Sequence, residues 1–284
     1  MYIGNHAVLY QDDILNKTEW VAAGLRAGGC DGIEVGQRFF GIDKRQELKE
    51  ILDKNGLNLS AFHVSALADE IFDQPETVME RFNQAAEFLQ AFPFKNIMFT
   101  SLPMEDLSTL PSEWDKRLHD EVCLKEWAVR LEEMAETLEE RGVTLHFHNH
   151  SWEFADDGKW FNAVAEYAPH VHLGLDIGWV YVAGFDPADI ILKYGKRINY
   201  VHLRDLNLAN VDPSLPFSAV HQTIFEDIGK GNAPLKEILM LLDDCMDKNG
   251  WATIEYEFGD RSFSRYSAAT TYIRNLLNEI KGRE

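Results

Sequence analysis

The sequence predicts an α/β fold, a single (β/α)8 TIM barrel spanning residues 1–284. Its 284 residues are close to the typical length of one such barrel. Short apolar runs alternate with long amphipathic stretches from end to end, a pattern typical of parallel α/β folds. The alternative, a doubly wound open sheet, usually has a glycine-rich phosphate turn after its first strand. Here the first strand leads into Tyr10-Gln11-Asp12-Asp13, which is no such turn.

Eight strand–helix pairs follow one another in strict order. The expected strands cover residues 2–9, 32–35, 58–63, 96–100, 143–148, 172–176, 198–203 and 251–256. The expected helices cover residues 17–27, 43–55, 75–92, a stretch ending at 141, 158–168, a stretch starting near 186–187, 233–249 and 263–281. Gly56 suits a helix C-cap, Pro75 a first turn, and Asp186-Pro187 an N-cap followed by proline. Long loops are expected at residues 101–120 and 205–232.

The charge balance is acidic, with 27 Lys and Arg against 47 Asp and Glu. Because nucleic-acid binding needs a basic face, we expect no nucleic-acid partner. The three cysteines are far apart and form neither a disulfide framework nor a CxxC metal motif. No leader-like N-terminus and no apolar run near the ~20 residues of a membrane span are visible. We therefore expect a cytoplasmic protein without a membrane partner, and a homo-oligomer remains open.

Polar residues gather where the expected strands end, which is where barrels of this kind carry their reactive groups. Each such group is costly to bury unless it is paired or binds a ligand. The residues are Glu34, His63, His146, His148, His150, Glu153, Asp176, His202, Arg204, Asp205, Glu255 and Glu257.

Structural roles compete with functional ones at several of these positions. Glu34 could form an ion pair, and His63 could be a satisfied core histidine. His146 is better explained as structural, deeper in the barrel. Asp176, His202 and Glu255 are harder to explain in this way, because three successive strands bring them together only if the barrel closes. The nearby aromatic residues could either pack in the core or line a pocket; they are Trp152, Phe154, Trp179 and Tyr181.

Mixed carboxylate and imidazole ligands suit Mn, Co, Fe or Zn better than Ca. A cation with open coordination positions can hold the carbonyl and a neighbouring hydroxyl of a sugar. It then stabilises the enediolate formed when a base removes the proton next to the carbonyl. Glu or His side chains nearby can move that proton.

Several segments resemble the xylose-isomerase-like sugar isomerase/epimerase superfamily, which includes inosose dehydratases and ketose 3-epimerases. Residues 148–154, HNHSWEF, are similar to its HNHxxEF segment, and residues 175–179 and 183–187 resemble its LDxxW and AGxDP stretches. Residues 202–205, HLRD, resemble its HxKD with Arg204 in place of Lys. Residues 229–231 resemble its GxG turn, and residues 250–255 its final GWxxxE strand. The agreement is in register from residue 143 to 257 and looser before it, through Glu34 and His63.

This resemblance implies one divalent metal ion (Mn, Co, Zn or Mg) held by Asp176, His202, Glu255 and a fourth group from the fifth strand. Ketose 3-epimerases carry a metal-binding Glu there, whereas this chain has His148. The fourth ligand is then His148, His150 or Glu153, and we favour Glu153 because it restores a carboxylate. The expected catalytic residues are Glu153, Glu255, His150, His63 and Glu34. The expected substrate-binding residues are His148, Trp179, Arg204, Lys230 and Glu257.

Three functions compete at this stage. The first choice is an isomerase or epimerase acting on a keto-sugar through an enediolate. The second is a lyase or dehydratase acting on a keto-inositol or 3-keto-glycoside, which the missing strand-five Glu favours. The third is a non-catalytic sugar- or metal-binding barrel. The endonuclease IV branch needs more metal ligands and a DNA-binding face, which an acidic chain does not offer. No glycine-rich phosphate cradle is visible, so we expect a non-phosphorylated substrate.

Overall fold

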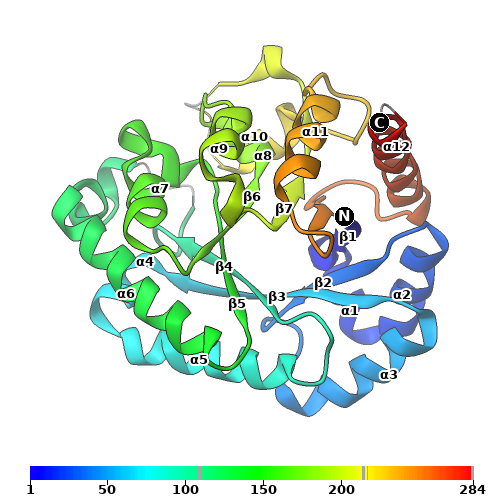
Figure 1. The fold of residues 1–284 in the computed structure, drawn as a ribbon, viewed down its shortest axis with the longest axis horizontal. Helices are drawn as coiled ribbons and strands as arrows, with labels where there is room; N and C mark the ends of the chain where they lie inside the picture. The colour runs from blue at the N-terminus through cyan, green and yellow to red at the C-terminus, as the bar shows by residue number, and fades with distance from the viewer. Residues whose placement is uncertain (108–110, 213–214, 216, 283–284) are drawn as a thin grey trace.

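Eight parallel strands close into a barrel surrounded by helices, which confirms the predicted fold (Figure 1). The computed structural model describes residues 1–107, 111–212, 215 and 217–282. Residues 108–110, 213–214 and 216 belong to the two long predicted loops and lie outside the described residues. Around the barrel the strands run β1-β10-β7-β6-β5-β4-β3-β2. The last helix packs beside α2, close to the start of the chain.

Chain order and barrel order agree, so the strands are easily followed. They are β1 (Tyr2–His6), β2 (Gly32–Gly36), β3 (Asn58–Leu67), β4 (Asn96–Leu102), β5 (Thr144–His148), β6 (His172–Asp176), β7 (Tyr200–Leu203) and β10 (Trp251–Ile254). The helices are α1 (Asp13–Asn16), α2 (Thr18–Ala27), α3 (Arg45–Asn55), α4 (Ala68–Asp73), α5 (Pro75–Leu89), α6 (Glu121–Glu139), α7 (Ala155–Tyr167), α8 (Ile177–Val182), α9 (Pro187–Tyr194), α10 (Phe217–Thr223), α11 (Leu235–Cys245) and α12 (Phe263–Lys281).

The first strand is shorter than predicted. It ends at His6, and residues Ala7–Tyr10 form a 3-10 turn instead of continuing the strand to residue 9. The apolar run that suggested a longer strand is buried for another reason, since Tyr10 packs against Phe263 and Tyr266 of α12. The consequence is that His6, and not Leu9, stands at the mouth of the barrel.

The connections on the same side of the barrel contain structure that the sequence did not predict. Helix α8 begins directly after β6 and is capped by Asp176, whose carboxylate accepts a hydrogen bond from the Trp179 amide. The segment after β7 contains a short antiparallel pair, β8 (Asp205–Leu206) and β9 (Phe225–Glu226), together with α10. None of the described helices is long and apolar enough to cross a membrane. The cytoplasmic location and the oligomeric state stay predictions.

Small residues make room for large ones at the floor of the barrel. Trp251 is fully buried there together with Tyr200 and Met98. Gly32 on β2 leaves space for the Trp251 ring, because a Cβ at this position would lie 2.5 Å from the ring and 2.9 Å from the Asn58 carbonyl oxygen. Well-packed interiors rarely absorb such overlap without a shift of the backbone.

We therefore expect Gly32→Ala to lower the free energy of unfolding by about 1–3 kcal/mol, the usual effect of overpacking a core. Urea unfolding measures it. The control is Gly41→Ala, where the added Cβ would meet only the end of the exposed Asp43 side chain. Equal unfolding midpoints for the two variants would show that contact with Trp251 does not constrain position 32.

Candidate metal centre and active-site cavity

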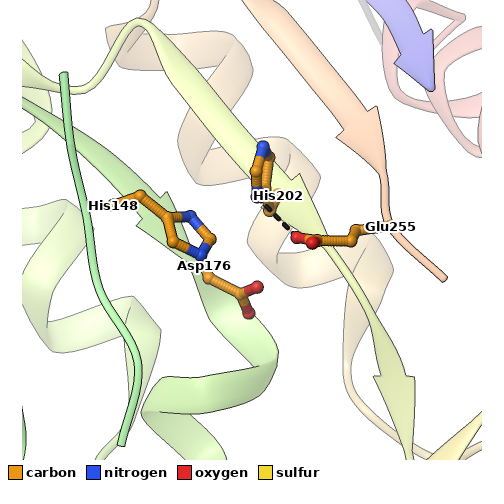
Figure 2. A group of neighbouring side chains, drawn as sticks. All are labelled: His148, Asp176, His202 and Glu255. Atoms are coloured by element: carbon orange, nitrogen blue, oxygen red, sulfur yellow. Dashed lines mark ion pairs between the residues drawn. The ribbon is translucent and has the colours of Figure 1, made fainter. Parts of the chain in front are cut away.

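Four side chains of metal-ligand type converge at the mouth of the barrel, as Figure 2 shows. Strands β5, β6 and β7 contribute one each, and the fourth lies just beyond the end of β10. The four are His148, Asp176, His202 and Glu255, all buried, and each offers an atom within 4.8 Å of the others. Asp176 and His202 are direct partners in the β6–β7 ladder, so closure of the barrel brings them together.

The donor atoms of this set fit a divalent cation. Nδ1 of His148 is buried without a hydrogen-bond partner among the described residues. His202 Nδ1 lies 2.6 Å from Glu255 Oε2, yet the two atoms lack the geometry of a hydrogen bond. Burial, chiefly, holds the pKa of His148 well below its usual value, so its imidazole is the neutral form that binds metals. Two imidazoles and two carboxylates suit a transition metal such as Mn, Co, Fe or Zn.

Glu153, the residue favoured from the sequence as fourth ligand, lies outside this set. Its carboxylate accepts hydrogen bonds from the His150 amide and the Trp152 indole, each at 2.7 Å. The residue is fully buried, and burial raises its pKa well above the usual value. Glu153 thus holds the turn after β5, and His148 is the member of the converging set that comes from β5.

Arg204, which was expected to bind substrate, is buried and forms ion pairs with three carboxylates. Its Nε lies 2.7 Å from Asp176 Oδ2, and its Nη2 lies 3.0 Å from Glu255 Oε2. The same Nη2 lies 2.5 Å from Glu257 Oε1. Although burial opposes ionisation, Arg204 and His202 hold the pKa of Glu255 well below its usual value. Arg204 is 3% exposed and lies behind the carboxylates rather than in front of them.

A second polar network centres on the buried carboxylate of Glu34. One oxygen, Oε2, accepts a hydrogen bond from the Tyr200 hydroxyl at 2.7 Å and lies 2.8 Å from His202 Nε2. The other, Oε1, lies 3.1 Å from His63 Nδ1. Carboxylates that bind the second nitrogen of a metal-binding histidine fix its tautomer and orientation. Glu34, predicted as an acid or base, is placed to orient His202.

His6 joins the site although its position in the sequence did not single it out. Its Nδ1 lies 3.0 Å from Glu255 Oε1 and its Nε2 lies 3.4 Å from Glu34 Oε1, so the ring bridges the two networks. The signal was present, because His6 is the last residue of β1. A first strand that ends at residue 6 rather than at residue 9 would place His6 among the polar residues at strand ends.

The two networks border one cavity of about 390 Å³. Its polar lining includes His6, Glu34, His63, Thr100, His148, His150, Glu255 and Glu257. His63, whose side chain is 20% exposed, and His150 and Glu257 therefore lie where the sequence analysis expected reactive or binding groups. Of the four candidate ligands, His148 and Glu255 face the cavity directly.

Besides Arg204, two further predicted substrate-binding residues do not line this cavity. Trp179 is fully buried in α8, where its ring stacks on Phe217 of α10 at 4.9 Å. Lys230 is exposed, in a turn whose Gly229 and Gly231 amides donate to Asp205. The motif around Trp179 thus forms the packing of α8 against α10, and the motif around Lys230 forms the loop after β7. Neither contributes its predicted residue to the cavity.

The fourth ligand can be identified by paired substitutions. We expect His148→Ala to lose the bound metal ion, because it removes an imidazole of the converging set. Glu153→Gln should retain the metal, although loss of one buried hydrogen bond lowers the free energy of unfolding by about 1–3 kcal/mol. Elemental analysis after purification without chelator measures the metal content of both variants. Metal loss in Glu153→Gln with retention in His148→Ala would restore the sequence-based assignment.

Glu255 and Glu257 provide a second matched pair, since they lie two residues apart at the end of one strand. We expect Glu255→Gln to abolish metal binding, because a neutral amide replaces a ligand carboxylate. Glu257→Gln should keep about one metal ion per chain, because Glu257 contacts Arg204 and the cavity rather than the ligand set. Calorimetric titration with Mn²⁺ distinguishes the two, and the opposite result would reverse the two roles.

Comparisons with known proteins identify the family and support the fold. An inosose dehydratase of Geobacillus kaustophilus (strain HTA426) is 25% identical over 98% of this chain and 90% of its own length. A probable 3-DHS dehydratase from Bacillus anthracis has a similar fold (TM-score 0.72, 15% identity, 97% of this chain and 99% of the other). So does a Mycobacterium smegmatis barrel protein in complex with magnesium (TM-score 0.73, 12% identity, 98% and 97%). The family model for xylose isomerase-like TIM barrels matches residues 22–276, and the chain belongs to this family.

Proposed function

We propose that this protein is a divalent-metal-dependent dehydratase that eliminates water from a cyclic polyhydroxylated ketone of the keto-inositol class. This was the second choice from the sequence, behind a keto-sugar isomerase or epimerase. The observation that carries it is the strand-five position, where His148 joins the ligand set and Glu153 is turned into the protein. The site thus lacks the strand-five carboxylate that would exchange a proton on carbon in a two-Glu epimerase.

The relatives support the same choice. A likeness of 25% over nearly the whole of both chains is to an inosose dehydratase, and an inosose is a keto-inositol. The neighbouring structures support only the fold, because their identities are 12% and 15%. The cavity of about 390 Å³ is suited to a small-molecule substrate.

The residues divide the work of a β-elimination between them. A divalent cation among His148, Asp176, His202 and Glu255 would polarise the ketone and stabilise negative charge on its oxygen. Side chains of the cavity wall take the proton from the carbon next to the carbonyl. The bond from the β-carbon to its hydroxyl oxygen then breaks, a carbon–carbon double bond forms, and the leaving hydroxide takes a proton to become water. His63, part-exposed in the cavity, is placed to carry protons.

Turnover in deuterated water tests the proposal. We expect the Mn²⁺-loaded enzyme to convert 2-keto-myo-inositol into a product lighter by one water, as mass spectrometry would show. D-fructose and D-tagatose, offered in parallel, should be returned unchanged. Chelator-treated enzyme and the Asp176→Asn variant are the controls, because the first lacks the metal ion and the second lacks a complete ligand set.

A different outcome identifies the competing function. Deuterium on carbon in a product of unchanged formula, formed from a ketohexose, would mean isomerisation or epimerisation and would overturn the dehydratase proposal. Metal binding without turnover of either class would leave the protein as a binding barrel, the third reading of the sequence.

A further inference from the structure

Three side chains from three adjacent strands form a hydrogen-bonded chain that ends in the cavity. Thr100 Oγ1 on β4 lies 2.7 Å from His63 Nε2 on β3. His63 Nδ1 lies 3.1 Å from Glu34 Oε1 on β2. All three residues line the cavity. The order of groups is hydroxyl, imidazole, carboxylate, the arrangement by which enzymes move a proton to or from a hydroxyl.

The direction of each bond follows from the chemistry of its ends. A carboxylate accepts hydrogen bonds, and Glu34 already accepts one from the Tyr200 hydroxyl. The Nδ1 atom of His63 therefore donates to Glu34. His63 Nε2 and the Thr100 hydroxyl are left facing each other. Nε2 accepts from this hydroxyl when the ring is neutral and donates to it when the ring carries a second proton, so a proton can cross this bond in either direction.

Thr100 is also placed next to the candidate metal centre. It is the direct ladder partner of His148 on β5, and Cα atoms of such partners lie about 5 Å apart. His148 lines the same cavity and belongs to the ligand set. A substrate held at that set would therefore have the Thr100 hydroxyl within reach, with His63 behind it.

We propose that Thr100 is a catalytic residue, and that its hydroxyl protonates the leaving oxygen in the elimination. As the bond from the β-carbon to oxygen breaks, the Thr100 proton passes to the departing oxygen, which leaves as water. The doubly protonated ring of His63 passes its Nε2 proton to Thr100 Oγ1 in the same step and becomes neutral, and its Nδ1–H still donates to Glu34. The electron pair of the broken bond leaves with the oxygen, and solvent returns one proton to His63. This inference rests on the proposed function.

The decisive variant is Thr100→Val, which keeps the shape and removes the hydroxyl. We expect elimination of water from 2-keto-myo-inositol to fall by about 100-fold or more, a usual contribution of general acid catalysis. Removal of the proton next to the carbonyl should continue, so deuterium from solvent should accumulate in the recovered substrate. Thr100→Ser should restore elimination. The matched control is Ser65→Ala, which removes a hydroxyl from the same cavity without touching the bonds of His63.

A substrate analogue separates acid catalysis from a structural role. Fluoride leaves without needing a proton, so an analogue with fluorine in place of the leaving hydroxyl should react equally fast with wild type and Thr100→Val. His63→Gln should behave like Thr100→Val with both compounds, which keeps the test valid if the valine variant folds poorly. In metal-free protein, the nitrogen NMR signal of His63 Nε2 should shift in Thr100→Val and return in Thr100→Ser.

Each remaining outcome overturns a defined part of the inference. Unchanged elimination in Thr100→Val with normal metal content overturns the role of Thr100 alone. An equal loss of water elimination, fluoride elimination and deuterium exchange would show that Thr100 only supports the structure. An unchanged His63 Nε2 signal would show that the hydrogen bond is absent in solution. A wild-type enzyme that neither exchanges nor eliminates overturns the proposed function, and this role with it.

Discussion

The buried carboxylate of Glu34 is the interaction on which the rest of the site depends. It is fully buried on β2, and such a charge is costly unless it is paired and hydrogen-bonded. Tyr200 and His202 meet one of its oxygens, and His63 and His6 lie beside the other. One carboxylate therefore orients a candidate metal ligand on one side and a proton carrier on the other. Loss of its charge would disturb both at once, because leaving a buried partner uncompensated is costly.

The choice of arginine at position 204, where the family motif has lysine, follows from the charge on the opposite side of the centre. Asp176, Glu255 and Glu257 lie close together, and their mutual repulsion needs a cation that reaches all three. A planar guanidinium donates in several fixed directions, whereas a lysine ammonium is a compact point charge. Arg204 contacts one carboxylate through Nε and two through Nη2. It contacts the two candidate ligand carboxylates, Asp176 and Glu255, while Glu255 still lines the cavity.

The fold could be predicted from sequence because its signals are repetitive and local. Each signal depends on only a few neighbouring residues. Examples are the alternating apolar runs, Gly56 in a left-handed conformation at a helix end, and the Asp186 cap. Asp176, His202 and Glu255 could also be selected, since parallel strands that close into a barrel bring their ends together. The strand-five ligand could not be settled in this way. His148, His150 and Glu153 are all polar and close in sequence, and only the turn after β5 decides which one faces inward.

Other failures have a similar physical origin. His6 was missed because an apolar run signals burial but does not distinguish a strand from a 3-10 turn packed under α12. Thr100 carried no sequence signal, because a threonine in a strand is ordinary and its value depends on a histidine 37 residues away. Trp179 and Lys230 lie in motifs that resemble the family, but a motif preserves local structure as readily as ligand contact.

The two sides of the barrel mouth differ, and this difference limits how a substrate can approach. Over the ends of β5 and β6, His150 stacks on Trp152 and Trp179 stacks on Phe217, which closes that side with aromatic rings. The cavity instead opens beside β1 to β4, so His148 and Glu255 face it while Asp176 and His202 lie behind. Under the proposed function, a ketone at the candidate metal centre would enter from the side that carries His63 and Thr100. A substrate hydroxyl that points towards this wall would then meet the proposed proton donor. The position of the opening would thus help to determine which carbon–oxygen bond breaks.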